Sequence, residues 1–203
     1  MTSPTRRSPL ALAVLALLAH QPLHPYGVQR LLKEWGKDQV VNVGQRAGLY
    51  KTMDRLHAAG LIAVRETSRD QQYPERTVYE LTDAGQQTAV RWMDEILAAP
   101  RNEFPEFPAA LSFLMMLTPE AILSALEQRR TNLTGTLAAL QAGLAASAQH
   151  GLPRIALLDD EYLHAVTKAE LGWVSGLIED LRTGALHWSP DELTAFAEQV
   201  AER

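Results

Sequence analysis

The side chains best suited to contact nucleic acid lie together in one short segment in the first third of the chain. Gln45 and Arg46 open this segment, and an arginine can pair with guanine while a glutamine can pair with adenine. Tyr50, Lys51 and Arg55 follow, and a phenol and two cations suit phosphate oxygens, which position a protein on DNA without reading its sequence. If the segment is helical, we expect the first pair to read bases and the other three to contact the backbone.

A second polar group lies between two runs of strand type. The runs Leu61–Glu66 and Thr77–Leu81 are rich in β-branched and aromatic residues, and the stretch between them is polar. This pattern predicts a hairpin with a long polar tip. We expect Arg69, Gln72 and Arg76 to contact the DNA backbone or the minor groove from this hairpin.

Three short helices are expected before the hairpin. Ser8 and Pro9 have the residue types of an N-cap and a first helical position, and the apolar run that follows should form a buried helix. A second helix is predicted from about Pro25 to Trp35, and a third from near Gly44 to the C-cap glycine at Gly60. Three helices followed by a hairpin is the order of a winged helix-turn-helix, in which the third helix enters the major groove.

A fourth helix and a proline-rich boundary should close this first region. The segment Thr82–Gly85 should cap a helix that runs to about Ala99, and Pro100, Pro105 and Pro108 interrupt the helical pattern after it. We therefore expect a DNA-binding domain over residues 1–99 and a helical domain over residues 100–203.

The second region is predicted to be a helical hairpin that resembles a coiled coil. We expect a short helix over Ala109–Leu117, long helices over Pro119–Gln149 and about Ile155–Thr183, and a last helix from Ser189 to about Glu202. The first long helix repeats leucines every three to four residues. The second has an apolar stripe at Leu158, Tyr162, Val166, Ala169, Trp173, Leu177 and Leu181. Two such surfaces favour a homodimer, although a helical cap within one chain is the alternative.

The charge of the chain is unevenly distributed. The net charge is −5. Residues 1–80 hold 11 Lys+Arg and 7 Asp+Glu, a net of +4, whereas residues 81–203 hold 8 and 17, a net of −9. A basic first part suits a module that meets phosphate through that part alone, and chance variation among solvated side chains is the other explanation.

Three motifs of the N-terminal region are similar to those of one protein family. Pro22–Val28 (PLHPYGV) is similar to the turn PLHGYEL, and Leu49–Ile62 to the helix pattern LYPxLxxLExxGLI. Pro74–Gly85 (PERTVYELTDAG) is similar to the strand pattern RPxxxYxLTxxG. On these motifs the sequence resembles the PadR family of transcriptional regulators. It departs from the family at Lys51, where a proline is common, and at Gly44–Gly48, so base preference does not transfer.

The resemblance carries its own implications. It implies a winged helix, dimerisation through C-terminal helices and a response to small aromatic or hydrophobic molecules. Trp92, Tyr162 and Trp173 are the aromatic side chains that we expect to contact such an effector by stacking, although large aromatic residues are more often part of a core.

Other classes of function find little support in the sequence. It has no cysteine, no Walker A loop, no GxGxxG, HExxH or GxSxG motif, and Pro22 separates His20 from His24, so we expect no enzyme, no metal site and no cofactor. The apolar run Leu10–Ala19 is too short to cross a bilayer, so we expect a cytoplasmic protein with no membrane partner.

The sequence thus predicts a mainly helical α+β protein, a winged helix-turn-helix followed by a helical hairpin. As function we expect a homodimeric, ligand-responsive repressor that binds a pseudo-palindromic site on double-stranded DNA. A winged-helix adaptor that binds proteins and not DNA is the alternative.

Overall fold

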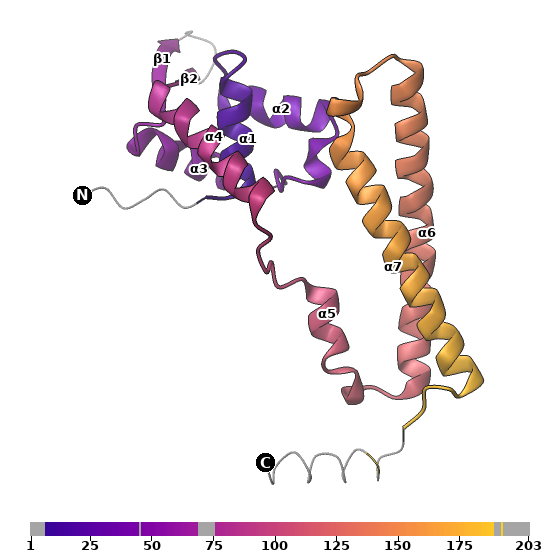
Figure 1. Cartoon of the computed structure of the whole chain (residues 1–203). Coiled ribbons are helices and arrows are strands. Elements are labelled where there is room, and N and C mark those ends of the chain that lie inside the picture. Colours follow the sequence, from indigo (N-terminus) through magenta and orange to yellow (C-terminus); the bar gives the residue numbers. More distant parts are fainter. Residues whose placement is uncertain (1–6, 45, 69–75, 189–191, 193–203) are drawn as a thin grey trace. The chain divides into compact units, whose positions relative to one another are not determined.

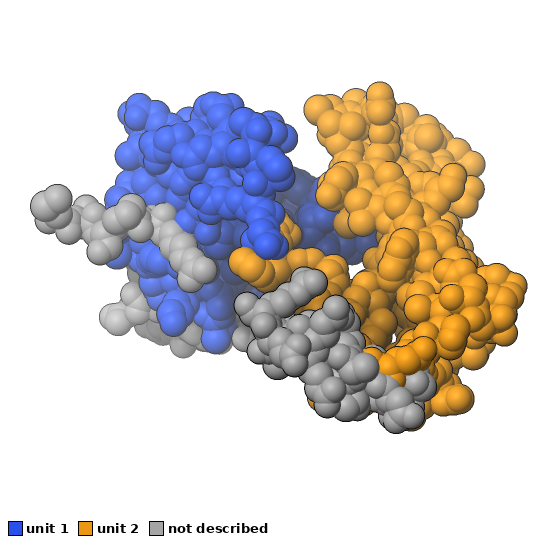
Figure 2. Space-filling model, turned by 60° about the horizontal axis from the view of Figure 1, so that its bottom comes forward, with its two compact units in different colours: residues 1–102 blue, residues 103–203 orange. Residues whose placement is uncertain are grey.

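The chain folds as two compact units, Met1–Asn102 and Glu103–Arg203 (Figure 2). The structure is a computed structural model, and it describes residues 7–44, 46–68, 76–188 and 192. The first unit contains α1 (Pro9–Leu18), α2 (Pro25–Glu34), η1 (Lys37–Gln39), α3 (Arg46–Ala58), β1 (Ile62–Ser68), β2 (Arg76–Leu81) and α4 (Asp83–Ala98). The second contains α5 (Glu106–Leu111), η2 (Leu114–Met116), α6 (Pro119–Gln149), η3 (Arg154–Ala156) and α7 (Leu158–Thr183) (Figure 1).

The first two helices begin at the residues that the sequence pattern indicates. The Ser8 hydroxyl accepts a hydrogen bond from the Ala11 N–H at 3.2 Å, and Pro9 occupies the first helical position of α1. At the start of α2 a histidine has the capping role: Nδ1 of His24 accepts from the Tyr26 N–H at 3.1 Å. The apolar run of α1 is buried, as predicted.

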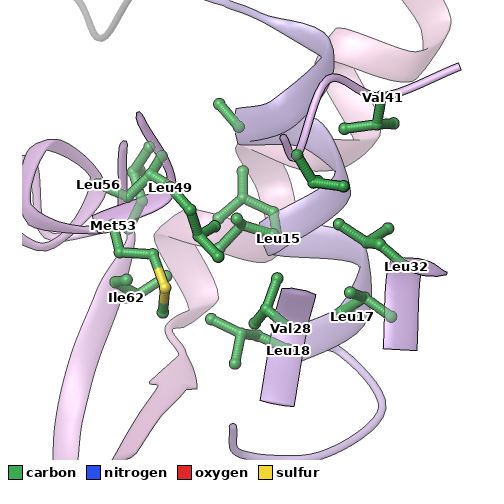
Figure 3. Close-up of a cluster of buried hydrophobic side chains, with 14 of the residues drawn as sticks. Leu15, Leu17, Leu18, Val28, Leu32, Val41, Leu49, Met53, Leu56 and Ile62 are labelled. Atoms are coloured by element: carbon green, nitrogen blue, oxygen red, sulfur yellow. The ribbon is translucent and has the colours of Figure 1, made fainter. Parts of the chain in front are cut away.

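One apolar core joins α1, α2, α3 and the hairpin. Figure 3 shows Leu15 of α1, Val28 of α2, Leu49 and Leu56 of α3 and Ile62 of β1 converging on it. In α3 the buried side chains recur every three to four residues, which is one face of a helix. The core therefore fixes which face of α3 points to solvent.

The hairpin pairs β1 and β2 antiparallel, with Ile62 opposite Leu81. The turn before α2 extends this sheet, because Leu23 and Tyr79 exchange both backbone hydrogen bonds, at 2.9 and 3.0 Å. The register slips by one residue between Val64 and Glu66, which makes Arg65 the additional residue of a β-bulge.

The start of α4 is locked onto the beginning of the hairpin. The Thr82 hydroxyl accepts from the Gly85 N–H at 3.1 Å and donates to the carbonyl of Gly60 at 2.7 Å, while the Thr82 N–H donates to the carbonyl of Leu61. These bonds bring Gly85 against the backbone of Leu61, where only a glycine fits. Thr82–Gly85 therefore caps α4, as predicted, and also docks it.

Two predicted helices of the second unit have different bounds, whereas α6 spans Pro119–Gln149 as predicted. The prediction of one helix over Ala109–Leu117 is wrong: α5 begins at Glu106 and the chain continues as η2. Pro108 is tolerated because it lies in the first turn, where its nitrogen has no helical acceptor. The second long helix begins at Leu158, because residues 154–156 form η3. Apart from Glu192, the expected last helix lies outside the described residues.

Helices α6 and α7 pack against each other along a small core of Ile122, Leu126, Val174 and Ile178. Leu177 and Leu181, the end of the predicted α7 stripe, are half-buried against this core. The rest of the stripe is exposed, namely Leu158, Tyr162, Val166, Ala169 and Trp173. The hairpin of α6 and α7 thus leaves one apolar face of α7 without a partner in the chain that the structure describes. None of the described helices is both long and apolar enough to cross a membrane.

We predict that Gly85→Ala destabilises the first unit. A Cβ atom there would overlap the Leu61 carbonyl oxygen and lie 2.7 Å from Cδ1 of Leu81, so α4 must shift. The expected loss in free energy of unfolding is about 2 kcal/mol or more, measured by urea denaturation. Gly48→Ala is the matched control, because no atom lies within 4 Å of the added Cβ. Alanine is more favourable than glycine in a helix interior by roughly 1 kcal/mol, so this variant should be at least as stable as the wild type. Equal stability of the two variants would contradict the docking role of Gly85.

Candidate nucleic-acid interface

Helix α3 presents the predicted nucleic-acid contacts outside its buried face. Arg46 is its first residue, and Arg46, Tyr50, Lys51 and Arg55 are all exposed. Gln45 lies outside the described residues. The exposed part of α3 covers about half of its circumference, so Lys51 and Arg55 lie on a different side from Tyr50.

The exposed cations of α3 take part in no described ion pair, although the exposed Asp54 lies on the same helix. The described ion pairs of the first unit join Arg7 to Glu95 at 2.8 Å and Arg30 to Glu34 at 3.5 Å. Among the residues that the structure describes, no ion pair includes Arg46, Lys51 or Arg55. Their charges are therefore available to an external anion, and phosphate groups of DNA are such anions.

One edge of α3 faces the hairpin. The rings of His57 and Tyr79 meet edge to face, with their centroids 5.8 Å apart, and His57 Nδ1 lies 3.1 Å from the carbonyl oxygen of Ile62. Burial raises the pKa of Tyr79, and the nearby Asp54 and Tyr50 raise it further. Tyr50 thus lies at the junction of α3 and the wing, the hairpin of β1 and β2.

The wing is described only in part. Arg76 begins β2 opposite Ser68, whereas Arg69 and Gln72 lie outside the described residues. Arg65 at the bulge is an exposed cation that the sequence reasoning missed. The sequence placed Arg65 inside a run of strand type and gave no sign of a bulge there. A bulge depends on how two strands pair, so neither strand alone indicates it.

The three predicted effector contacts occupy different environments. Trp92 belongs to the core of the first unit and is only 6% exposed. Tyr162 and Trp173, 69% and 51% exposed, lie on one face of α7 in the second unit. They are eleven residues apart, or about 16 Å along the helix, which is longer than most small aromatic molecules.

Trp173 is part of an aromatic and ionic cluster. It meets the Phe107 ring edge to face at 6.1 Å, and the guanidinium of Arg129 lies 3.4 Å from the centroid of Phe107. Arg129 is also paired with Glu170. This cluster fastens α5 to α6 and α7 and leaves half of the Trp173 side chain exposed.

The described residues contain no cluster of side chains suited to a metal ion. Among them, no group of three or more His, Asp or Glu side chains could hold a metal ion.

Comparisons with known proteins identify the fold. The chain matches Bacillus subtilis PadR bound to operator DNA with a TM-score of 0.69 and 20% identity, over 86% of this chain and 99% of that one. B. subtilis PadR in complex with p-coumaric acid gives a TM-score of 0.64 and 18% identity, over 87% and 99%. The Vibrio cholerae virulence activator AphA gives 0.63 and 18%, over 86% and 98%. No curated protein sequence matches significantly.

These structures share the winged helix with a C-terminal helical region. The model of the transcriptional regulator PadR-like family matches residues 14–91, which hold α2, α3 and both strands of the wing. On this match and this fold, residues 14–91 are a PadR-like region in a chain that has the winged-helix fold of these structures.

Proposed function

We propose that this protein is a PadR-like transcriptional regulator that binds a specific, pseudo-palindromic site on double-stranded DNA as a homodimer. It represses transcription until a small aromatic or hydrophobic molecule releases it. The observation that carries the proposal is the set of exposed cations on α3 of a winged helix, which take part in no described ion pair. The operator complex of B. subtilis PadR, which has the same fold, supports it.

We assign base recognition to Gln45 and Arg46, because the start of a recognition helix reaches base edges. Tyr50, Lys51 and Arg55 contact phosphate from the rest of α3. The wing residues Arg69, Gln72 and Arg76 contact the backbone or the minor groove.

We assign dimerisation to residues 100–203 and to the exposed stripe of α7. Trp173 follows Leu158 by fifteen positions, or about 22 Å along the helix, and the exposed side chains of the stripe include a tyrosine and a tryptophan. A second copy would cover these side chains and place two α3 helices on successive turns of DNA.

We assign effector binding to the exposed aromatic side chains of α7. The complex of B. subtilis PadR with p-coumaric acid supports a small aromatic ligand. At the dimer interface, Trp173 and Tyr162 offer an effector two separate points for stacking, whereas the buried Trp92 belongs to the core. An effector acts if it binds one spacing of the two α3 helices more tightly than the other.

We place the protein in the cytoplasm, where chromosomal DNA is available to it. The alternative, an adaptor that binds only proteins, would leave the cations of α3 without a partner. A winged-helix adaptor would bind duplex DNA weakly at every salt concentration, and binding measurements on the wild type distinguish the two functions.

The first test is loss of base recognition in Arg46→Ala. Binding to a labelled duplex from the protein's own upstream region should weaken by roughly 1 to 3 kcal/mol, while binding to a scrambled duplex changes little. Fluorescence anisotropy measures both. Arg91→Ala, which removes an exposed arginine of α4 in the same unit, should bind both duplexes as the wild type does. An unchanged preference in Arg46→Ala would remove this residue from the readout.

Lys51→Ala should weaken binding to every duplex alike. A lost phosphate contact releases one counterion fewer, so the slope of log K against log salt should fall by about 1 for each subunit. Anisotropy titrations at several salt concentrations give this slope. Lys168→Ala on α7 is the control, and an equal effect of the two variants would indicate a general effect of charge.

Val166→Glu should convert the dimer to a monomer. The carboxylate would be buried without a partner in the middle of the stripe, and dimer dissociation should become more favourable by about 2 kcal/mol or more. Sedimentation velocity over a range of concentrations measures the change. Lys168→Glu adds the same side chain about 160° away around α7 and should stay dimeric. A dimeric Val166→Glu would place the interface elsewhere.

A further inference from the structure

Gln29 is a buried polar side chain on the inner face of α2. Only 7% of it is exposed, and its neighbours on that face, Val28 and Leu32, belong to the apolar core. An amide in such a place is destabilising unless it is hydrogen-bonded. Its position in an apolar face indicates a specific polar partner.

The partner of Gln29 is the backbone just before α3. Nε2 of Gln29 donates to the carbonyl oxygen of Val43 at 3.0 Å, in a buried bond that spans fourteen residues. Val43 is three residues before Arg46, the first residue of α3. The bond therefore links α2 directly to the start of the recognition helix.

The segment between η1 and α3 is held mainly from its inner side. The side chains of Val41 and Val43 enter the core, and the side-chain oxygen Oδ1 of Asn42 accepts a hydrogen bond from the Gly44 N–H at 3.2 Å. On the outer side lies an open hollow of about 470 Å³, lined in part by Asn42 and Gly44. The Val40 and Val41 N–H groups donate to the carbonyl of Lys37 at the start of the segment. Closer to α3, the described contacts that tie the segment to the rest of the unit are the buried valines and the bond from Gln29.

We propose that Gln29 is a positioning residue for base recognition: its bond to Val43 sets where α3 begins and so where Arg46 meets a base edge. This inference rests on the proposed function. A bidentate contact between arginine and guanine needs two hydrogen bonds of good geometry at once, and a small shift of α3 breaks it. Contacts of long cations with phosphate tolerate such a shift, because they depend mostly on distance.

The test compares specific and non-specific binding in Gln29→Met. Methionine has a similar length and no donor. The probes are a duplex that the wild-type protein enriches from a random pool and a scrambled form of it. We expect the ratio of the two affinities to fall about tenfold or more, while affinity for the scrambled duplex and its salt dependence stay unchanged. A purely structural role would lower both affinities together.

One further variant is a control, and another is a second test of the bond. Thr88→Val removes a buried hydroxyl of α4 in the same unit and should keep the wild-type ratio. Gln29→Asn keeps the amide but shortens the side chain by one methylene, so it cannot reach Val43 in the same position. It should lose specificity as Gln29→Met does, and it serves as the test if the methionine variant does not fold.

A double-mutant cycle decides whether Gln29 acts through Arg46. In an Arg46→Ala background, Gln29→Met should change the affinity ratio by less than about twofold, because the contact that it positions is already absent. Additive effects, or a wild-type ratio in Gln29→Met, would overturn the inference and leave the proposed function intact. Failure of the wild type to enrich any duplex would overturn both.

Discussion

The structure depends on one constraint, which is that the short helix α3 must bury one face and keep the other free. Leu49, Met53 and Leu56 are held in the core of the first unit, and this fixes the rotation of α3 about its axis. The cations outside this buried face then remain in solvent, and none of them takes part in a described ion pair. Packing thereby determines which side chains are available for the DNA contacts that we propose.

The elements around α3 help to hold it in this orientation. Leu23 joins the turn before α2 to β2, and the His57 and Tyr79 rings join α3 to the wing. Thr82 and Gly85 close the unit by docking α4 on the first residues of the hairpin. A net charge of −5 is compatible with this arrangement, because affinity for phosphate depends on the local cations that the fold exposes.

In the second unit, the two long helices have more apolar surface than they can bury between themselves. Val174 and Ile178 of α7 pack against α6, and the stripe residues between Leu158 and Trp173 stay exposed. Residues that the pair of helices does not cover are free to contact a second copy or a ligand. The same surplus therefore supports both the dimer and the effector response that we propose.

Local signals in the sequence determined much of this protein. Capping residues such as Ser8, Thr82 and Thr118 set the helix starts, because a cap needs only its own few neighbours. The change from helical to strand periodicity located the wing, and family motifs indicated its use. The exposed residues of α3 followed from its heptad-like spacing of apolar residues.

Only the tertiary structure decided the features that depend on a partner distant in sequence. The stripe of α7 could have faced α6 by its periodicity, but Val174 and Ile178 take that place, and only the packing of two helices selects between neighbouring faces. The burial of Trp92, the bulge at Arg65 and the bond from Gln29 to Val43 are of the same kind. Each requires two segments to meet, and a pattern within one segment does not encode that meeting.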